Sequence, residues 1–237
     1  MRTTKSPSRS WKSILVITTL ALLPGGTAGA NGPKDSARTF ALNSLSGLEV
    51  VSKGAEAATY RGRRVLRLLQ STEQDPTGQT LAIINGSDFK DGVIETELAG
   101  MPRTGAADSI RGFVGIAFRV QPHGAKYEAF YLRMTNGRSD DQVRRNHSAQ
   151  YICEPDFPWE RLRKENPGVY ESYVDLEPGA WTRVKIVVAG TKASLYVNGS
   201  SQPCLVVNDL KLGETHGQIA LWAGQDTDAY FSKLTVK

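Results

Sequence analysis

The sequence has little of the chemistry that metal and redox sites use. Only three histidines and two cysteines occur in its 237 residues. The histidines His123, His147 and His216 lie in expected loops, and no two of them are spaced to share one turn or strand, as zinc ligands usually do. No zinc site is therefore predicted. A phosphate-binding loop, a dinucleotide fingerprint and a Ser-His-Asp arrangement are also missing, so no cofactor is predicted.

Long apolar runs are missing too, and the single apolar segment begins near the amino terminus. Residues 14–23 are apolar, which is about half of the roughly 20 residues that a membrane-spanning helix needs. Basic residues precede this run and the small residues Ala28, Gly29 and Ala30 follow it, which is the order of a secretory signal peptide. We predict a signal peptide over residues 1–30, cleavage after Ala30, no membrane span, and a secreted or periplasmic protein.

An excess of charge of one sign is also missing once that segment is removed. The first 30 residues contain Arg2, Lys5, Arg9 and Lys12 and no acid, so the formal net charge falls from +5 to about +1. A nearly neutral domain gives no electrostatic reason to expect a nucleic-acid partner. Residues 31–237 are long enough to bury a core as one all-β domain.

Helical periodicity is rare in this domain, whereas short alternating apolar stretches are frequent. Gly and Asn turns separate these stretches, which is typical of a β-sandwich. The predicted strands are residues 48–53, 64–69, 80–84, 92–98, 113–121, 127–134, 182–188, 193–198, 218–223 and 230–236.

Two of these strands are expected to form a binding floor. Alternation places Val114, Ile116, Phe118, Val120, Phe130 and Leu132 in the core. The opposite face then presents Arg119, Tyr131 and Arg133, with small residues leaving room above the sheet. Trp222 falls on the non-core side of its strand and is either a further aromatic platform or packed under a loop.

The strand pattern fails between Asn136 and Gly179. Segments this long without regular structure are usually functional or disordered, and this one is too aromatic for a disordered linker. We predict an ordered flap over residues 136–179 that lies against the sheet, with a short helix at residues 158–165. The flap contains Cys153, which forms a disulfide with Cys204 if the exported chain is oxidised; two free thiols are the alternative.

Several segments resemble the concanavalin A-like lectin and glucanase superfamily. Trp181 opens a predicted hairpin that ends in Tyr196-Val197-Asn198-Gly199, which is similar to a hairpin of laminin-G-like domains. The segments 217–224 and 231–236 are similar to the last two strands of these folds. The resemblance implies a two-sheet antiparallel jelly roll, but this superfamily includes lectins, glycosidases, lyases and adhesion modules. The strand layout also resembles the 3-keto-disaccharide hydrolase domain, from which no catalytic residue is transferred.

The floor and the flap together have the residue types of a sugar site. Aromatic rings stack on the apolar face of a sugar, and planar polar groups bind its hydroxyls. The alternative is that the arginines pair with flap carboxylates and that Trp159 is a small core of the flap. The candidate ligand-binding residues are Arg119, Tyr131, Arg133, Asn136, Arg145, Tyr151 and Trp159, with Arg144 as the alternative to Arg145.

A catalytic pair of carboxylates is not evident. Glu95 and Glu97 share one face of a strand, but the alternating acidic pattern of the glucanases lacks its central Asp here. Glu128 and Glu165 are no better supported. Asp226 and Asp228 have the loop spacing of calcium ligands, although turn-forming acids are the simpler reading.

The leading hypothesis is therefore an exported carbohydrate-binding jelly roll that holds a glycan or polysaccharide between the floor and the flap. The first alternative is a carbohydrate-active enzyme on the same scaffold, a glycoside hydrolase or lyase. The second is an adhesion or assembly module whose flap binds protein.

Overall fold

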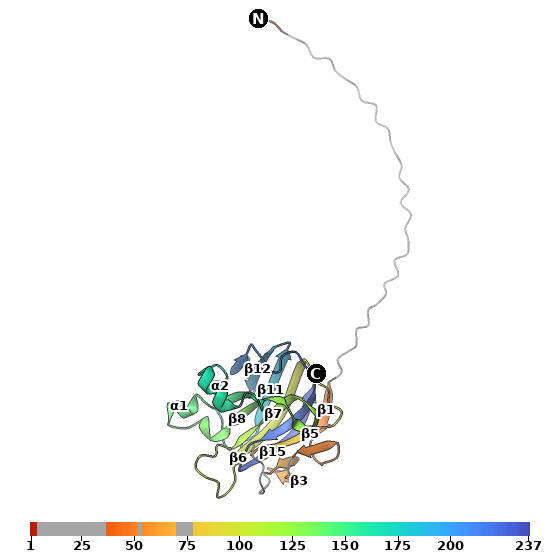
Figure 1. Cartoon of the computed structure of the whole chain (residues 1–237), viewed down its shortest axis with the longest axis vertical. Coiled ribbons are helices and arrows are strands. Elements are labelled where there is room, and N and C mark those ends of the chain that lie inside the picture. Colours follow the sequence, from red (N-terminus) through yellow and green to blue (C-terminus); the bar gives the residue numbers. More distant parts are fainter. Residues whose placement is uncertain (4–36, 52–53, 70–77) are drawn as a thin grey trace, which may run out of the picture. The chain divides into compact units, whose positions relative to one another are not determined.

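Fifteen strands of the described residues form two antiparallel sheets (Figure 1). The structure is a computed structural model that describes residues 1–3, 37–51, 54–69 and 78–237. The predicted signal peptide and its cleavage site lie outside the described residues, apart from residues 1–3. Residues 35–237 form one compact unit.

Sheet A has the strand order β13-β12-β11-β6-β15-β4-β3, and β1 also pairs with β15. Sheet B has the order β10-β9-β8-β7-β14-β5-β2. All ten predicted strands are present, and the all-β sandwich is confirmed. The strands of sheet A are β1 (Arg38–Ala41), β3 (Ala55–Tyr60), β4 (Arg63–Leu68), β6 (Gly92–Pro102), β11 (Thr182–Ala189), β12 (Lys192–Val197), β13 (Leu205–Val207) and β15 (Thr227–Val236). Those of sheet B are β2 (Leu48–Val51), β5 (Thr80–Ile84), β7 (Phe113–Val120), β8 (Tyr127–Arg133), β9 (Ala149–Glu154), β10 (Glu171–Ser172) and β14 (Gln218–Ala223).

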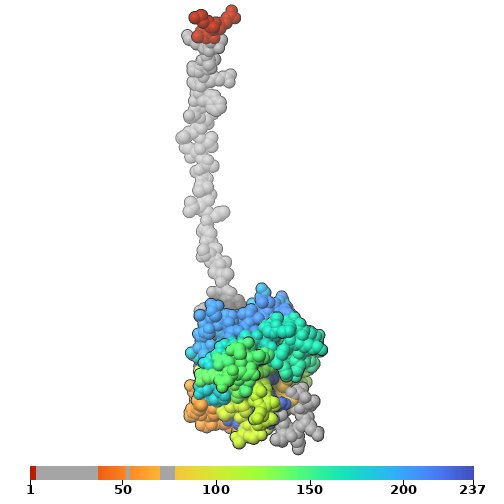
Figure 2. Space-filling model, turned by 90° about the vertical axis from the view of Figure 1, so that its left-hand side faces the viewer, coloured from red at the N-terminus to blue at the C-terminus, as the bar shows by residue number. Residues whose placement is uncertain are grey.

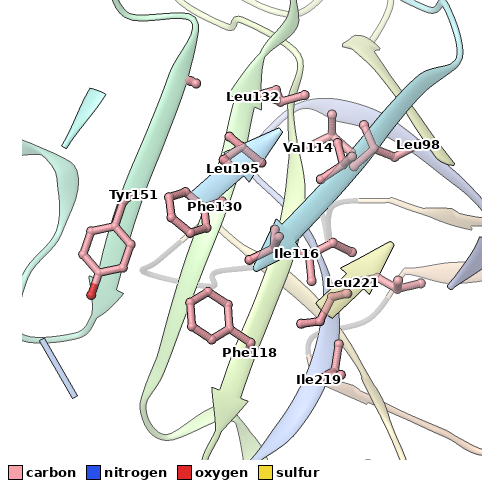
Figure 3. Packing of buried hydrophobic residues seen from close by; sticks show 14 of the residues in the cluster. Leu98, Val114, Ile116, Phe118, Phe130, Leu132, Tyr151, Leu195, Ile219 and Leu221 are labelled. Carbon is pink, nitrogen blue, oxygen red and sulfur yellow. The ribbon is translucent and has the colours of Figure 1, made fainter. Parts of the chain in front are cut away.

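The core lies between the two sheets. Val114, Ile116 and Phe118 of β7 face it, as the alternation predicts, and they pack with Phe130 and Leu132 of β8 (Figure 3). The opposite face of sheet B carries a second, smaller apolar cluster that includes Ala117, Ala129, Tyr131, Ile152 and Trp222. Sheet B is thus covered on both faces over much of its area.

A β-bulge at Arg119 breaks the alternation in β7. Arg119 has a positive φ of 52°, and the pairing of β7 with β14 shifts register between Gln218 and Ala220. The extra residue exchanges the faces of the strand beyond it. Val120 therefore joins the outer apolar cluster, and its predicted place in the core is wrong.

The segment 136–179 contains more regular structure than its sequence pattern suggests. It holds the helices α1 (Gln142–Arg145) and α2 (Trp159–Glu165) and the strands β9 and β10. The predicted helix at residues 158–165 is confirmed by α2. Strand β9 was not predicted because both of its faces are buried, so polar and apolar residues do not alternate: Tyr151 and Cys153 face the core, and Ile152 faces the outer cluster.

The helices of the described part of the chain are short. They are α1, α2 and the 3₁₀ turns Pro122–Gly124 and Met134–Asn136. Within the described ranges, no helix is long and apolar enough to cross a membrane.

Candidate functional site

A cleft of about 740 Å³ lies on the outer face of sheet B. Residues of β7, β8, β9 and β14 form its floor, and residues of α1, α2 and the loops beside them form its walls. The side of the domain that carries α1 and α2 faces the viewer in Figure 2. The volume falls within the range of small-molecule sites, roughly 300 to 1,000 Å³.

Aromatic rings form the floor of the cleft. Gly115 of β7 lies between two aromatic residues on the neighbouring strands: it pairs with Trp222 of β14 on one side and with Tyr131 of β8 on the other. The two rings meet above the glycine and stack with their centroids 4.6 Å apart. A Cβ atom at Gly115 would lie only 2.6 Å from the Cβ of Tyr131, so glycine is what lets this row pack. Phe113 extends the row, with its ring edge-on to Tyr131 at 6.1 Å.

Arg133 connects the floor to the α2 wall. Its guanidinium carbon lies 5.1 Å from the centroid of the Tyr131 ring and 5.5 Å from that of Trp159. Its Nη2 donates to the Tyr131 hydroxyl at 2.8 Å, and its Nη1 donates to Gln150 at 3.1 Å. Arg163 lies on Trp159 as well, at 4.6 Å. Trp159 is 37% exposed, so much of its surface remains available to a ligand.

Glu171, a buried carboxylate, organises the cations behind this wall. It accepts two hydrogen bonds from the fork of Arg163, at 2.9 and 2.7 Å. Its Oε2 lies 3.2 Å from His147 Nδ1 and 3.8 Å from Arg133 Nη1. Burial lowers the pKa of His147, and the positive charges of Arg163 and Arg133 lower this pKa further. The negative charge of Glu171 raises it, but the net shift is downward. The imidazole therefore loses its proton at a lower pH than an ordinary histidine.

Carboxylates and an amide line another part of the cleft. Gln79 Nε2 donates to Glu154 Oε1 at 3.2 Å, and Trp222 Nε1 donates to Gln79 Oε1 at 3.1 Å. Burial raises the pKa of Glu154; the bond from Gln79 opposes this, and the charge of Glu160 adds to it. The Glu154 carboxyl group therefore keeps its proton to a higher pH than an ordinary glutamate.

The remaining part of the wall contains Arg111, Asn136, Arg144 and Asp141. Arg144 donates from Nε to Asn136 Oδ1 at 2.9 Å and from Nη2 to Thr135 Oγ1 at 2.8 Å. Asp141 caps α1 by accepting the backbone N–H groups of Val143 and Arg144.

Four of the seven predicted ligand-binding residues line this cleft: Tyr131, Arg133, Asn136 and Trp159. Trp222, considered either a platform or a packed residue, also lies in its floor. Arg145 does not line the cleft; it donates to the Tyr173 hydroxyl at 3.0 Å, and its neighbour Arg144 takes the cleft position.

Arg119 and Tyr151 lie elsewhere, between the sheets. The bulge turns Arg119 away from the floor, and its side chain is fully buried. It donates to the carbonyls of Lys90, Gly190 and Gly213 and lies 3.4 Å from Glu128. Tyr151 faces the same interior and donates to Glu128 at 2.7 Å. Placing Arg119 on the floor was wrong because strict alternation does not hold across a bulge.

Three cleft residues, His147, Glu154 and Arg163, are not among the predicted ligand-binding residues. His147 was noted only for lacking a second histidine at ligand spacing, and its partner Glu171 lies on another strand. Glu154 ends β9, the strand that was not recognised. Arg163 could have been found from the predicted helix, since it is four residues after Trp159 and shares its face.

The other acids considered as catalytic or metal-binding are engaged elsewhere. Glu95 pairs with Lys237 at 2.6 Å and Glu97 with Arg63 at 2.9 Å, away from this cleft. Glu165 pairs with Arg161 within α2. Asp226 and Asp228 pair with Arg103 and Arg67. In the part of the chain that the structure describes, no three His, Cys, Asp or Glu residues are grouped to hold a metal ion.

Cys153 and Cys204 are free thiols in the structure, in place of the predicted disulfide. Cys153 is buried in the core, where desolvation raises its pKa to about 12. Cys204 precedes β13 and is half-buried, and burial raises its pKa to about 11. Both thiols are therefore protonated and unreactive in the folded protein.

The comparisons with known proteins agree with the fold. A family model described as the 3-keto-alpha-glucoside-1,2-lyase-like domain matches residues 39–237. The carbohydrate-binding module CBM66 from Bacillus subtilis matches with a TM-score of 0.53 and 14% identity, over 79% of this chain and 94% of that one. A Bacillus subtilis protein with a galectin-like fold matches with a TM-score of 0.55 and 13% identity, over 84% and 94%. The β-glucanase of Bacillus licheniformis has a TM-score of 0.50 and 11% identity, over 86% and 99%. No curated protein matches the chain.

Proposed function

Because the chain belongs to the 3-keto-alpha-glucoside-1,2-lyase-like domain family, we propose that its cleft on sheet B binds a carbohydrate. The observation that carries the proposal is the aromatic floor and wall beside planar hydrogen-bonding groups. Trp159 is 37% exposed at the wall, and Gln79, Glu154, Arg133 and Arg163 line the cleft with it. This combination suits a ring that is apolar on its faces and polar around its edge.

The protein is also proposed to be exported, on the grounds of the residue order in segment 1–30. Export places the cleft where environmental glycans are met.

The test of binding compares two exposed aromatic residues of the same flap. Trp159→Ala removes a wall residue of the cleft, whereas Tyr173→Ala removes an aromatic residue that does not line it. A glycan array identifies the ligand, and calorimetry then measures affinity while thermal melting measures stability. Trp159→Ala is expected to weaken binding by roughly 1 to 3 kcal/mol, and Tyr173→Ala to leave it unchanged.

The structural alternative predicts a different result for the same pair of variants. If Trp159 only anchors α2 through Arg133 and Arg163, its loss lowers the melting temperature and the folded fraction binds normally. Unchanged affinity with lowered stability would reject the cleft as the binding site.

A second candidate function is the elimination that the family's description names, and His147 favours it. In a 3-keto-glucoside the hydrogen on C2 is acidic because it is next to the ketone. A neutral imidazole can accept that proton, and the electrons of the C2–H bond then form the C1=C2 double bond. The C1–O bond breaks, and its electrons leave on the aglycone oxygen, which is then protonated. His147 suits the first role because Glu171 holds Nδ1, and Nε2 makes no hydrogen bond among the described residues. Glu154, with its raised pKa, is the cleft carboxyl suited to protonate the leaving oxygen.

The enzymatic candidate is tested with a 3-keto-glucoside as substrate and product analysis by mass spectrometry. Elimination yields an unsaturated keto sugar, and His147→Gln should abolish its formation while binding of the parent glycoside survives. The rate in the wild-type protein should rise with pH at a lower pH than an ordinary histidine would give, since the pKa of His147 is lowered. Activity that survives His147→Gln would remove this role from His147.

A further inference from the structure

Two of the four arginines in the cleft lack a carboxylate partner. Arg133 and Arg163 share Glu171. Arg111 and Arg144 make no ion pair with any described residue, although both line the cleft. Arg144 donates only to the neutral oxygens of Thr135 and Asn136, and Arg111 donates to the backbone carbonyl of Asp108.

These two guanidinium groups lie close enough to affect each other. Burial lowers the pKa of Arg111, and the positive charges of Arg144 and Arg133 lower this pKa further. The negative charge of Asp108 raises it, but the net shift is downward. Like charges that converge on partly buried space cost free energy unless an anion lies between them. Each group also keeps unused N–H donors, among them Nη1 of Arg144 and Nε of Arg111, which make no hydrogen bond with the described residues.

None of the described carboxylates that line the cleft or lie behind it makes an ion pair with Arg111 or Arg144. The Oδ1 atom of Asp141 accepts hydrogen bonds from two backbone N–H groups in the first turn of α1. Glu171 is buried behind the wall with Arg163 and His147. Glu154 and Glu160 line the cleft beside Gln79 and Trp159, and the negative charge of Glu160 raises the pKa of Glu154. The cleft therefore has an arginine part and a carboxylate part above one aromatic floor.

We infer that Arg111 and Arg144 form a subsite for an anionic substituent of the sugar, a uronic acid carboxylate or a sulfate ester. Guanidinium groups bind both anions through paired, charge-assisted hydrogen bonds. The inference rests on the proposed function, since the floor holds the sugar ring while the arginines select its charge. Glu154 and Glu160 would disfavour a second negative group at their part of the cleft, so the preferred ligand carries its charge on one side.

The test uses three methyl glycosides of one sugar: the glucoside, the glucuronide and the glucoside 6-sulfate, with sodium sulfate as a fourth probe. Affinities are measured by NMR titration at a constant low ionic strength of about 20 mM, where screening is weak. The variants are Arg111→Gln, Arg144→Gln and their double substitution. Arg64→Gln is the matched control because Arg64 is an exposed arginine of β4 in sheet A and does not line the cleft.

The wild-type protein is expected to bind at least one acidic glycoside about ten-fold to a hundred-fold more tightly than the neutral one. Whether the glucuronide or the sulfate is preferred identifies the anion. The double substitution should reduce that preference to about two-fold or less, and Arg64→Gln should leave it unchanged.

Equal affinity for neutral and acidic glycosides would overturn the anionic subsite and leave the proposed function standing. Binding of free sulfate with no binding of any glycoside would overturn both, since the arginines would then be an anion site without a sugar. A preference that persists in the folded double variant, as checked by thermal melting, would assign the selectivity to other residues.

Discussion

Replacing Arg119 by methionine should destabilise the domain strongly, although this residue lies far from any surface function. The side chain is fully buried and donates to Gly213 O at 2.6 Å, Gly190 O at 2.7 Å and Lys90 O at 3.0 Å. Its carboxylate partners are Asp91, at 3.3 Å, and the buried Glu128, at 3.4 Å. One guanidinium thus joins three loops to strand β8.

The magnitude follows from what the substitution leaves behind. Methionine is apolar and of similar volume, so the cavity term is small beside the lost hydrogen bonds and charge pairing. Glu128 would remain buried without its cation, and removing one partner of a buried pair costs about 3 to 5 kcal/mol. The three carbonyl oxygens lose the N–H donors from which they accept, and water can replace these donors only in part, so the lower end of this range is a conservative expectation.

A double-mutant cycle makes the reasoning specific. Glu128→Gln keeps an acceptor oxygen for the Tyr151 hydroxyl and for Leu212 N–H, which now bond Glu128 Oε1. In the wild-type background this change places an amide donor toward Arg119 and should destabilise. In the Arg119→Met background it removes an uncompensated buried charge and should stabilise by roughly 1 to 3 kcal/mol.

Urea denaturation near neutral pH measures all four proteins, with equal m-values as the check for two-state unfolding. The explanation fails if Arg119→Met costs less than about 1 kcal/mol, or if Glu128→Gln has the same sign and size in both backgrounds.

Three further predictions concern other parts of the chain. Glu154→Gln should raise stability more at about pH 7 than at about pH 4. Burial raises the pKa of Glu154 in the folded state, so ionisation of Glu154 lowers the stability of the wild-type protein as the pH rises above the pKa of the unfolded state. Denaturation of both proteins at the two pH values checks this, and an equal gain at both would contradict it. The exported protein should begin at Asn31, and intact mass spectrometry that finds Met1 retained would exclude the predicted cleavage. Cys153 and Cys204 should react with a thiol reagent only after unfolding, since burial raises the pKa of both; rapid labelling of the native protein would show that the thiols are more exposed than the structure has them.

The parts of the fold that could be predicted are those where one face of a strand is apolar and the other is not. Strand β11 has this pattern, because buried and exposed or half-exposed residues alternate along it, and turn residues mark its ends. Strand β9 could not be recognised in this way because Gln150 and Tyr151 are both buried, one on each face. Alternation carries no information about a strand that is covered on both sides.

The candidate site was predicted in outline because two strands and the flap supply it. Tyr131 and Arg133 have the predicted orientation, and the guanidinium of Arg133 lies against the rings of both Tyr131 and Trp159. Arg119 was misplaced because a bulge depends on the backbone at one residue, which the apolar pattern does not show. The choice between Arg144 and Arg145 also needed the structure, because neighbours on a helix point about 100° apart and only one can face the cleft.

The α2 wall gives the cleft a property that a rigid pocket would lack. This helix has seven residues, which is too short to be stable alone, and the stack of Tyr131, Arg133, Trp159 and Arg163 holds it on the sheet. A ligand that contacts Trp159 should stabilise α2 on the sheet and so slow the local opening that exposes its amides to hydrogen exchange. The size of this protection depends on the ligand concentration relative to its dissociation constant. Slower hydrogen exchange in this one helix would then report occupancy of the cleft before the ligand itself has been identified, and would rank candidate sugars without any assay of turnover.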